Sequence, residues 1–261
     1  MADGAASIFE EVPLVAESTI SGKRGRPSGL PLPLFLGAVL LMSPAPLEAQ
    51  DSLWGSVELP YRSRYLFAGT SFGVRHVQQA QLAVGRGGLT VYGFAVYEFD
   101  QSSIIEADLS ADYFFDVSSS IGVFVGGALY NFDLGPDGGW EGTQEVYGGV
   151  TSSVLLNPTL LVGHDFDLGD GTHATLGLLH SIPLGERGIG LDLGGSLEYN
   201  HHYYTDDSGF AYVDGSVELV VPLGAVTLSP IFIVQRRLDP VFEYAVPDAE
   251  VWGITASFDF D

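Results

Sequence analysis

The feature that most constrains the fold is a period-two alternation of apolar and polar residues, which recurs along the chain. In the stretch IIEADLSADYFF, Ile105, Ala107 and Leu109 belong to an apolar set of alternate residues, whereas the set between them contains Ile104, Glu106, Asp108 and Asp112. Successive side chains of a β-strand point to opposite faces. The stretch is therefore predicted to be a strand with an apolar face and an acidic face.

Twelve segments carry strand-like patterns and are bounded by clusters of Gly, Asp, Asn and Pro. The predicted strands are 53–68, 74–85, 88–99, 103–115, 119–132, 143–155, 159–168, 172–183, 188–200, 209–222, 225–237 and 249–260. Most exceed the usual globular strand of about 5–6 residues. They fit the roughly 9–11 residues that a tilted strand needs to cross a bilayer.

The connections between these segments alternate in length. After even-numbered segments they are short, as in RGG (86–88) and LG (223–224). After several odd-numbered segments they are longer and polar, at 133–142, 201–208 and 238–248, although 100–103 is short. This parity is typical of a transmembrane barrel with short periplasmic turns, longer external loops and an even number of strands.

The two faces of each strand allow two architectures. In a soluble sandwich the apolar face packs on a second sheet, whereas in a membrane barrel it meets lipid and the acids face the interior. Aromatic residues near strand ends favour the barrel, because interfacial girdles sit there. The expected girdle residues are Tyr61, Phe67, Tyr97, Phe99, Tyr113, Phe115, Tyr130, Phe132, Tyr199 and Tyr212.

The N-terminal part has the composition of an export signal. Lys23, Arg24 and Arg26 precede the apolar run 30–42, and small residues follow up to Ala49. A positive region, an apolar region and a small-residue cleavage region define a secretory signal. We therefore expect residues 1–49 to be an N-terminal extension plus signal peptide, and residues 50–261 to be the barrel domain.

Composition excludes several functions. The net charge of −23 argues against nucleic acid, which requires a basic surface. The chain has no cysteine, so disulfides, thiolate metal sites and cysteine nucleophiles are excluded, and no cofactor is expected. The mean hydropathy is nevertheless positive, +0.24, which indicates that much apolar surface lies outside a soluble core.

The stretch SRYLFAGTS, 63–71, resembles the first-strand signature of the TorF-type porin family, also called the Gcw_chp family. The resemblance continues through 106–108, 126–132 and 143–149, and covers roughly 55–200. It implies an outer-membrane barrel with a channel role and no defined substrate. The family's usual arginine after the aromatic is Ala68 in this chain.

Alternation predicts which residues line the interior. From residue 50 onward the chain has 28 acids, seven arginines and no lysine, so a hydrated, acidic lumen is expected. Some of these acids are expected to pair with Arg62 and Arg64, because unpaired charges in a confined site are costly. Glycines at 122, 126, 149, 194 and 253 are expected to widen the lumen. The predicted lumen-lining residues are Glu58, Arg62, Arg64, Glu98, Glu106, Asp108, Asp112, Glu145, Asp192, Glu198, Asp214 and Glu218.

Catalytic and metal-binding patterns are weak. His180 and Ser181 are neighbours and so face opposite ways. His173 and Thr175 share a face, but Thr is a poor substitute for a nucleophilic Ser, so these histidines are expected at the membrane interface. His201-His202 with Asp206-Asp207 could bind a metal, but a solvated loop next to an aromatic girdle is the favoured interpretation. GDGTH (169–173) and GPDGG (135–139) lack the spacing of a calcium loop.

The sequence therefore predicts an all-β, antiparallel, up-and-down transmembrane β-barrel of about twelve strands in the outer membrane, exported by a signal peptide. The expected function is a narrow, cation-preferring channel for small solutes, with no enzymatic activity. Its expected partners are outer-membrane lipids, lipopolysaccharide and small solutes or cations; the sequence assigns no oligomeric state. The alternatives are a non-conducting structural or adhesive barrel that acts through its loops, and an outer-membrane lipid hydrolase.

Overall fold

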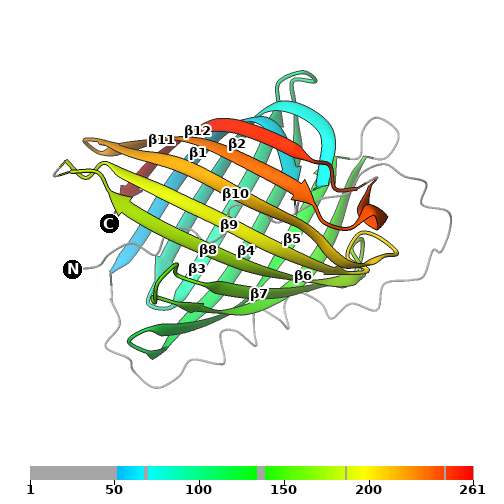
Figure 1. The fold of residues 1–261 in the computed structure, drawn as a ribbon, viewed down its shortest axis with the longest axis horizontal. Helices are drawn as coiled ribbons and strands as arrows, with labels where there is room; N and C mark the ends of the chain where they lie inside the picture. Colours follow the sequence, from blue (N-terminus) through cyan, green and yellow to red (C-terminus); the bar gives the residue numbers. More distant parts are fainter. Residues whose placement is uncertain (1–51, 68–69, 134–138, 186, 244, 261) are drawn as a thin grey trace.

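The described part of the chain is a closed antiparallel barrel in which each strand pairs with its neighbours in sequence (Figure 1). The computed structural model describes residues 52–67, 70–133, 139–185, 187–243 and 245–260; side chains 70–73 and the predicted signal, 1–49, lie outside this description. The twelve strands of these residues are β1 (Leu53–Phe67), β2 (Thr70–Arg86), β3 (Leu89–Glu98), β4 (Ser103–Ser118), β5 (Ile121–Asp133), β6 (Trp140–Ser152), β7 (Thr159–Asp165), β8 (Gly171–Pro183), β9 (Gly190–His201), β10 (Ser208–Leu223), β11 (Val226–Arg237) and β12 (Ala249–Phe260). The predicted fold class and strand number are confirmed.

Pairing of the first and last strands closes the barrel. Register runs from Gly55 opposite Phe260 to Arg62 opposite Gly253. Closure leaves no sheet edge with unpaired backbone groups, which is what a strand structure needs in a medium without water. In the described chain, no helix is long and apolar enough to cross a membrane.

The connections separate the two ends of the barrel (Figure 1). Two-residue turns, 87–88 and 224–225, join strands at the end where β1 begins and β12 ends, whereas 202–207 and 238–248 lie at the opposite end. The long connection contains a short 3₁₀ helix, η1 (Pro240–Phe242), capped by Asp239. We refer to these as the turn end and the loop end.

Two connections differ from the predicted lengths. At the loop end, β1 ends at Phe67 and β2 already begins at Thr70, four residues before the predicted start at residue 74. At the turn end, β6 ends at Ser152, three residues before the predicted boundary, and the connection 153–158 is correspondingly longer. Within this connection, Leu156 and Asn157 adopt positive φ angles of 69° and 37°. These two residues therefore form a turn rather than extended backbone, and Pro158 follows just before β7 begins.

The outer surface of the barrel is apolar. Leu109 is 50% exposed, and large aliphatic side chains such as Leu59, Leu82 and Val217 are exposed in the same way on other strands. Their sequence neighbours on the opposite face include the buried Gln81 and the half-buried Glu58 and Glu218. The barrel is therefore apolar outside and polar inside, the reverse of a soluble domain.

A β-bulge changes the face assignment at the start of β4. The register with β3 shifts between Val96 and Tyr97, so Ile105 is an extra residue between Ile104 and Glu106. Ile104 is 50% exposed and Ile105 packs against the interior cluster. The prediction that Ile104 shares a face with Glu106, and Ile105 the other face, was wrong for this reason.

Four of the predicted girdle aromatics lie inside the barrel. Phe67, Tyr130, Phe132 and Tyr212 are almost fully buried. Phe67 makes edge-on contacts with Tyr130 and Phe132, with ring centroids 6.0 and 5.9 Å apart. Tyr130 and Phe132 share strand parity with buried Phe124 and Ala128, which places them inward however close they are to a strand end.

The interior glycines seat neighbouring side chains and do not widen the lumen as predicted. A Cβ on Gly122, Gly126 or Gly149 would lie 2.1–2.4 Å from the ring of Phe114, Tyr147 or Phe124, respectively. Gly194 and Gly253 likewise lie against the side chains of Ser216 and Arg62. Each absent side chain is replaced by a neighbour's side chain folded over the strand.

The carboxylate-lined interior

None of the twelve predicted interior residues is exposed. Glu106 is only 1% exposed, and the other eleven are buried or half-buried. The buried members are Arg62, Glu98, Glu106, Asp112, Glu145 and Glu198. The half-buried members are Glu58, Arg64, Asp108, Asp192, Asp214 and Glu218.

The interior carboxylates are held largely by hydroxyl groups. The hydroxyls of Tyr65, Thr175 and Ser196 donate to Glu106, Glu198 and Asp214, respectively. Thr175 and Glu198 are cross-strand neighbours, as are Ser196 and Asp214, whereas Tyr65 lies on β1 and Glu106 on β4. A carboxylate that accepts such bonds is stabilised without a basic residue. Arginine partners were predicted from the sequence, whereas these hydroxyl partners were not.

One histidine lies between two interior carboxylates. His173 Nδ1 is 3.1 Å from Glu198 Oε1, and its Nε2 is 3.3 Å from Glu145 Oε2, close enough for an ion pair but not aligned as a hydrogen bond. Both ring nitrogens of an imidazolium are donors, so the doubly protonated ring suits this position between two carboxylates. His173 is buried, and the prediction that it lies at the membrane interface was wrong.

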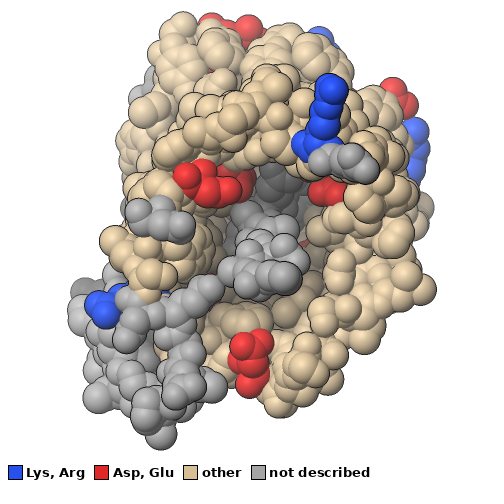
Figure 2. Space-filling view, turned by 90° about the vertical axis from the view of Figure 1, so that its left-hand side faces the viewer, with Lys and Arg blue, Asp and Glu red and all other residues tan. Residues whose placement is uncertain are grey.

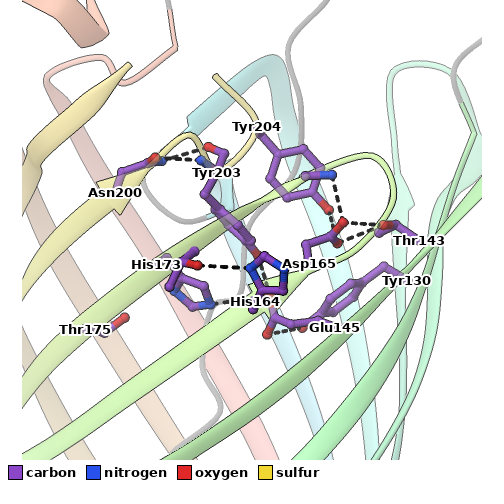
Figure 3. Close-up of polar contacts among 12 residues, drawn as sticks. Tyr130, Thr143, Glu145, His164, Asp165, His173, Thr175, Asn200, Tyr203 and Tyr204 are labelled. Carbon is purple, nitrogen blue, oxygen red and sulfur yellow. Dashed lines mark hydrogen bonds and ion pairs between the residues drawn. The ribbon is translucent and has the colours of Figure 1, made fainter. Parts of the chain in front are cut away.

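A glycine on the intervening strand permits this contact. His173 on β8 reaches Glu145 on β6 across Gly163 of β7 (Figure 3). A Cβ at Gly163 would lie 2.3 Å from His173 Nε2 and 2.9 Å from Glu145 Oε1. Because Gly163 of β7 has no side chain, the side chains of Glu145 on β6 and His173 on β8 can meet above it.

The β9–β10 connection folds over this cluster with two tyrosines, here called the Tyr203–Tyr204 latch (Figure 3). The Tyr203 hydroxyl donates to Glu145 Oε2 at 2.7 Å, and its ring centroid lies 4.4 Å from that of His173. The Tyr204 hydroxyl donates to Asp165 Oδ2 at 3.1 Å. Asn200 fixes the turn by accepting from the Tyr203 N–H and donating to the Tyr203 carbonyl, both at 2.8 Å.

The environment of the latch keeps both phenols neutral. Burial, followed by the negative charge of Glu145, raises the pKa of Tyr203 well above its ordinary value. Burial and the nearby Asp165 raise the pKa of Tyr204 in the same way. Both hydroxyls therefore remain protonated donors toward the carboxylates at all physiological pH values.

Asp165 anchors the other side of the latch and was not among the predicted site residues. It accepts from the Thr143 hydroxyl at 2.6 Å and from the backbone N–H groups of Asp167 and Gly169 at 2.9 and 2.8 Å. Its strand parity matches that of buried Leu161, which was a usable signal for an inward side chain. The partnership with Tyr204, 39 residues away, had no sequence signal.

The rest of the interior is partly apolar. Ile231, Ile233 and Val251 are buried on β11 and β12, and a larger aromatic cluster surrounds Phe67 and Phe132. At the loop end, Phe242 of η1 packs against Tyr212. At the turn end the barrel is hollowed, and acidic side chains, together with basic ones, lie around the opening (Figure 2).

The remaining chemical candidates do not assemble into a site in the described chain. No group of three His, Asp or Glu side chains in the described ranges is arranged to hold a metal ion. His201 stacks on His202, and its Nδ1 lies 2.9 Å from the Ser208 hydroxyl. Ser181 lies in register with Asp192, whereas His180 lies in register with Leu193.

These features define a class: a closed membrane-type β-barrel with an apolar exterior and a carboxylate-rich interior. No family model matches the chain, and no curated relative matches it. Among solved structures, it resembles the KdgM porin with a TM-score of 0.52 and 13% identity, over 79% of this chain and 99% of that one. A KdgM porin in complex with disordered oligogalacturonate matches with a TM-score of 0.50 and 11% identity, over 79% and 99%. The NanC porin matches at 0.47 and 11% identity, over 78% and 98%. The KdgM likeness shows that the fold is that of a porin.

Proposed function

We propose that this chain is an outer-membrane channel that passes small cations through a narrow, acid-lined interior. One observation carries the proposal: buried carboxylates such as Glu98, Glu106, Asp112 and Glu198 occupy the inner face, where Arg62 is the buried arginine of the described residues. Carboxylates inside low-dielectric walls attract cations and repel anions. The twelve predicted lumen residues are, on this proposal, the lining of the solute path.

The location follows from the outer face and the N-terminus. An exposed apolar band on a closed barrel suits a bilayer, with lipids and lipopolysaccharide as neighbours. On this proposal, the signal peptide within residues 1–49 directs export. The resemblance of 63–71 to the TorF-type porins supports the same placement, and we propose membership of that family on this ground.

The Tyr203–Tyr204 latch and the aromatic cluster set the narrow part of the channel. Both lie among buried side chains, and the latch reaches from the loop end onto Glu145 and Asp165. Of the neighbours, one KdgM structure holds oligogalacturonate, an acidic oligosaccharide. The acid-rich wall of this chain disfavours such a polyanion, so we propose small cations and small neutral solutes as its substrates.

Ion selectivity tests the proposal. In planar bilayers under a KCl gradient, the wild-type protein is expected to give a reversal potential on the cation-selective side. Changing Glu106, Asp108 and Asp112 to their amides is expected to move it toward zero, because three lumenal charges are lost. The preference also weakens at about 1 M salt, where the screening length is roughly 3 Å. The outward-facing Glu250→Gln variant is the control and retains wild-type selectivity. Anion preference of the wild type would contradict the proposal.

A second function has its own support. The packed aromatic cluster around Phe67, Phe124 and Phe132 suits a plugged barrel that acts through its loops as a structural or adhesive protein. Absence of conductance from correctly folded protein would favour this alternative. A hydrolase has less support, because the Thr175 hydroxyl donates to Glu198 and His173 faces two carboxylates. We therefore propose a non-enzymatic role.

A further inference from the structure

Three buried carboxylate oxygens on the inner wall have no hydrogen-bond partner in the described chain. They are Glu98 Oε2, Glu106 Oε1 and Asp112 Oδ2, on β3 and β4. Each belongs to a residue that is at most 4% exposed. A buried carboxylate oxygen without a donor is costly, so such an oxygen indicates a missing proton or cation.

Glu106 differs from the other two because a second carboxyl group lies within hydrogen-bonding distance of it, whereas Asp100 acts on Glu98 only through its charge. Asp108 follows two residues later on the same face of β4, and its carboxyl group is within hydrogen-bonding distance of Glu106. The remaining contacts leave oxygens available to a ligand. Tyr65 donates to Glu106 Oε2, and the Asn131 backbone N–H donates to Asp108 Oδ1 at 3.1 Å.

The strands around this pair supply no positive charge. Val96 lies opposite Glu106 and Phe94 lies opposite Asp108 on β3, while Phe132 lies opposite Glu106 on β5. His173 pairs with Glu145 and Glu198, and Arg236 pairs with Glu250, so neither of these side chains is the partner of Glu106 or Asp108. Two adjacent carboxylates without a basic partner repel each other, and a ligand of charge +2 would neutralise both.

We propose that the Glu106–Asp108 pair is a binding site for a hard divalent cation, of which Ca²⁺ is the best match. Carboxylate oxygens are the preferred ligands of Ca²⁺, whose flexible coordination accepts two protein carboxylates and several waters. Asp108 is half-buried, which leaves one side of the pair open to the lumen. Tyr65 acts as the positioning residue, because its hydroxyl holds one oxygen of Glu106 and turns the other toward the ligand. The inference rests on the proposed function, since the cation reaches the site through the lumen.

Direct calcium binding tests the site. The folded full-length protein in detergent micelles is titrated with Ca²⁺ alone by isothermal calorimetry or ⁴⁵Ca²⁺ flow dialysis. The wild type is expected to bind one Ca²⁺ that is lost in Glu106→Gln/Asp108→Asn. Tyr65→Phe is expected to weaken binding about 10–100-fold, as for other groups that orient a metal ligand. The control Glu250→Gln/Asp259→Asn removes the same charge from exposed positions and is expected to leave affinity unchanged.

The rival explanation is a proton shared by the two carboxyl groups. It predicts an infrared carboxylic-acid band that disappears in Glu106→Gln, and Ca²⁺ binding that does not differ between the wild type and the double variant. That result would overturn the inference. If the double variant does not fold, as judged by heat-modifiable gel mobility, Asp108→Asn alone carries the test. Cation-selective conductance without Ca²⁺ binding would overturn the site and leave the channel intact, whereas Ca²⁺ binding without conductance would overturn the channel alone.

Discussion

Removing one hydroxyl from the latch should open it without unfolding the barrel. In Tyr203→Phe, the bond of 2.7 Å to Glu145 Oε2 is lost, while the ring can still stack on His173. Glu145 keeps its contact with His173 and the Tyr130 hydroxyl. The β-strands and their register are untouched, so the effect is confined to 202–207 and its contacts.

The size of the effect follows from the burial and charge of the bond. Both partners are buried, and a hydrogen bond to a charged group contributes about 1.5–3 kcal/mol. Since about 1.4 kcal/mol corresponds to a factor of ten, the open population of the latch should rise about 10- to 150-fold. Larger single-channel conductance or longer open times should accompany this rise if the latch narrows the path.

Amide hydrogen exchange measures the opening directly. The Tyr203 N–H donates to Asn200 Oδ1 and the Tyr204 N–H donates to the Gly169 carbonyl, so both amides are protected only in the closed latch. Their exchange should accelerate by the same factor, with little change in β8 or β9. Tyr199→Phe, an outward-facing change on the same hairpin, is the control. Unchanged protection of both amides in Tyr203→Phe would refute the latch.

Three further predictions follow from the fold and the site. Gly163→Ala should lower the free energy of unfolding by about 1–3 kcal/mol, because the new Cβ meets His173 Nε2 at 2.3 Å. In the same urea titration Gly93→Ala, whose Cβ meets nothing within 4 Å, should change it far less, and equal effects would contradict the packing argument. Tags inserted at 202–207 or 238–248 should be labelled on intact cells, and tags at 224–225 should not; the reverse pattern would invert the topology. The protein should fractionate with the outer membrane and migrate differently on gels when unheated, and recovery as a soluble periplasmic protein would refute the placement.

The alternation of side chains determined the barrel. A period of two determines which residues of a strand share a face. From this rule alone, the acids of β4, β9 and β10 were predicted to share the inner face of the barrel. Turn residues and connection parity then gave the number of strands, because an odd count would have put long loops at both ends. Side-chain alternation and turn residues depend only on residues close together in the sequence, so both can be read from the sequence alone.

The tertiary structure decided which inward residues meet. His173 on β8 contacts Glu145 on β6 only because the intervening strand β7 has Gly163 in register with His173. The bulge at Ile105 moved Ile104 to the outer face, an irregularity that alternation cannot anticipate. The Tyr203–Glu145 bond joins residues 58 positions apart, and Tyr65 reaches Glu106 across 41. Such pairings depend on strand register, closure and loop conformation, which are set by the packing of the whole barrel and not by any local pattern of residues.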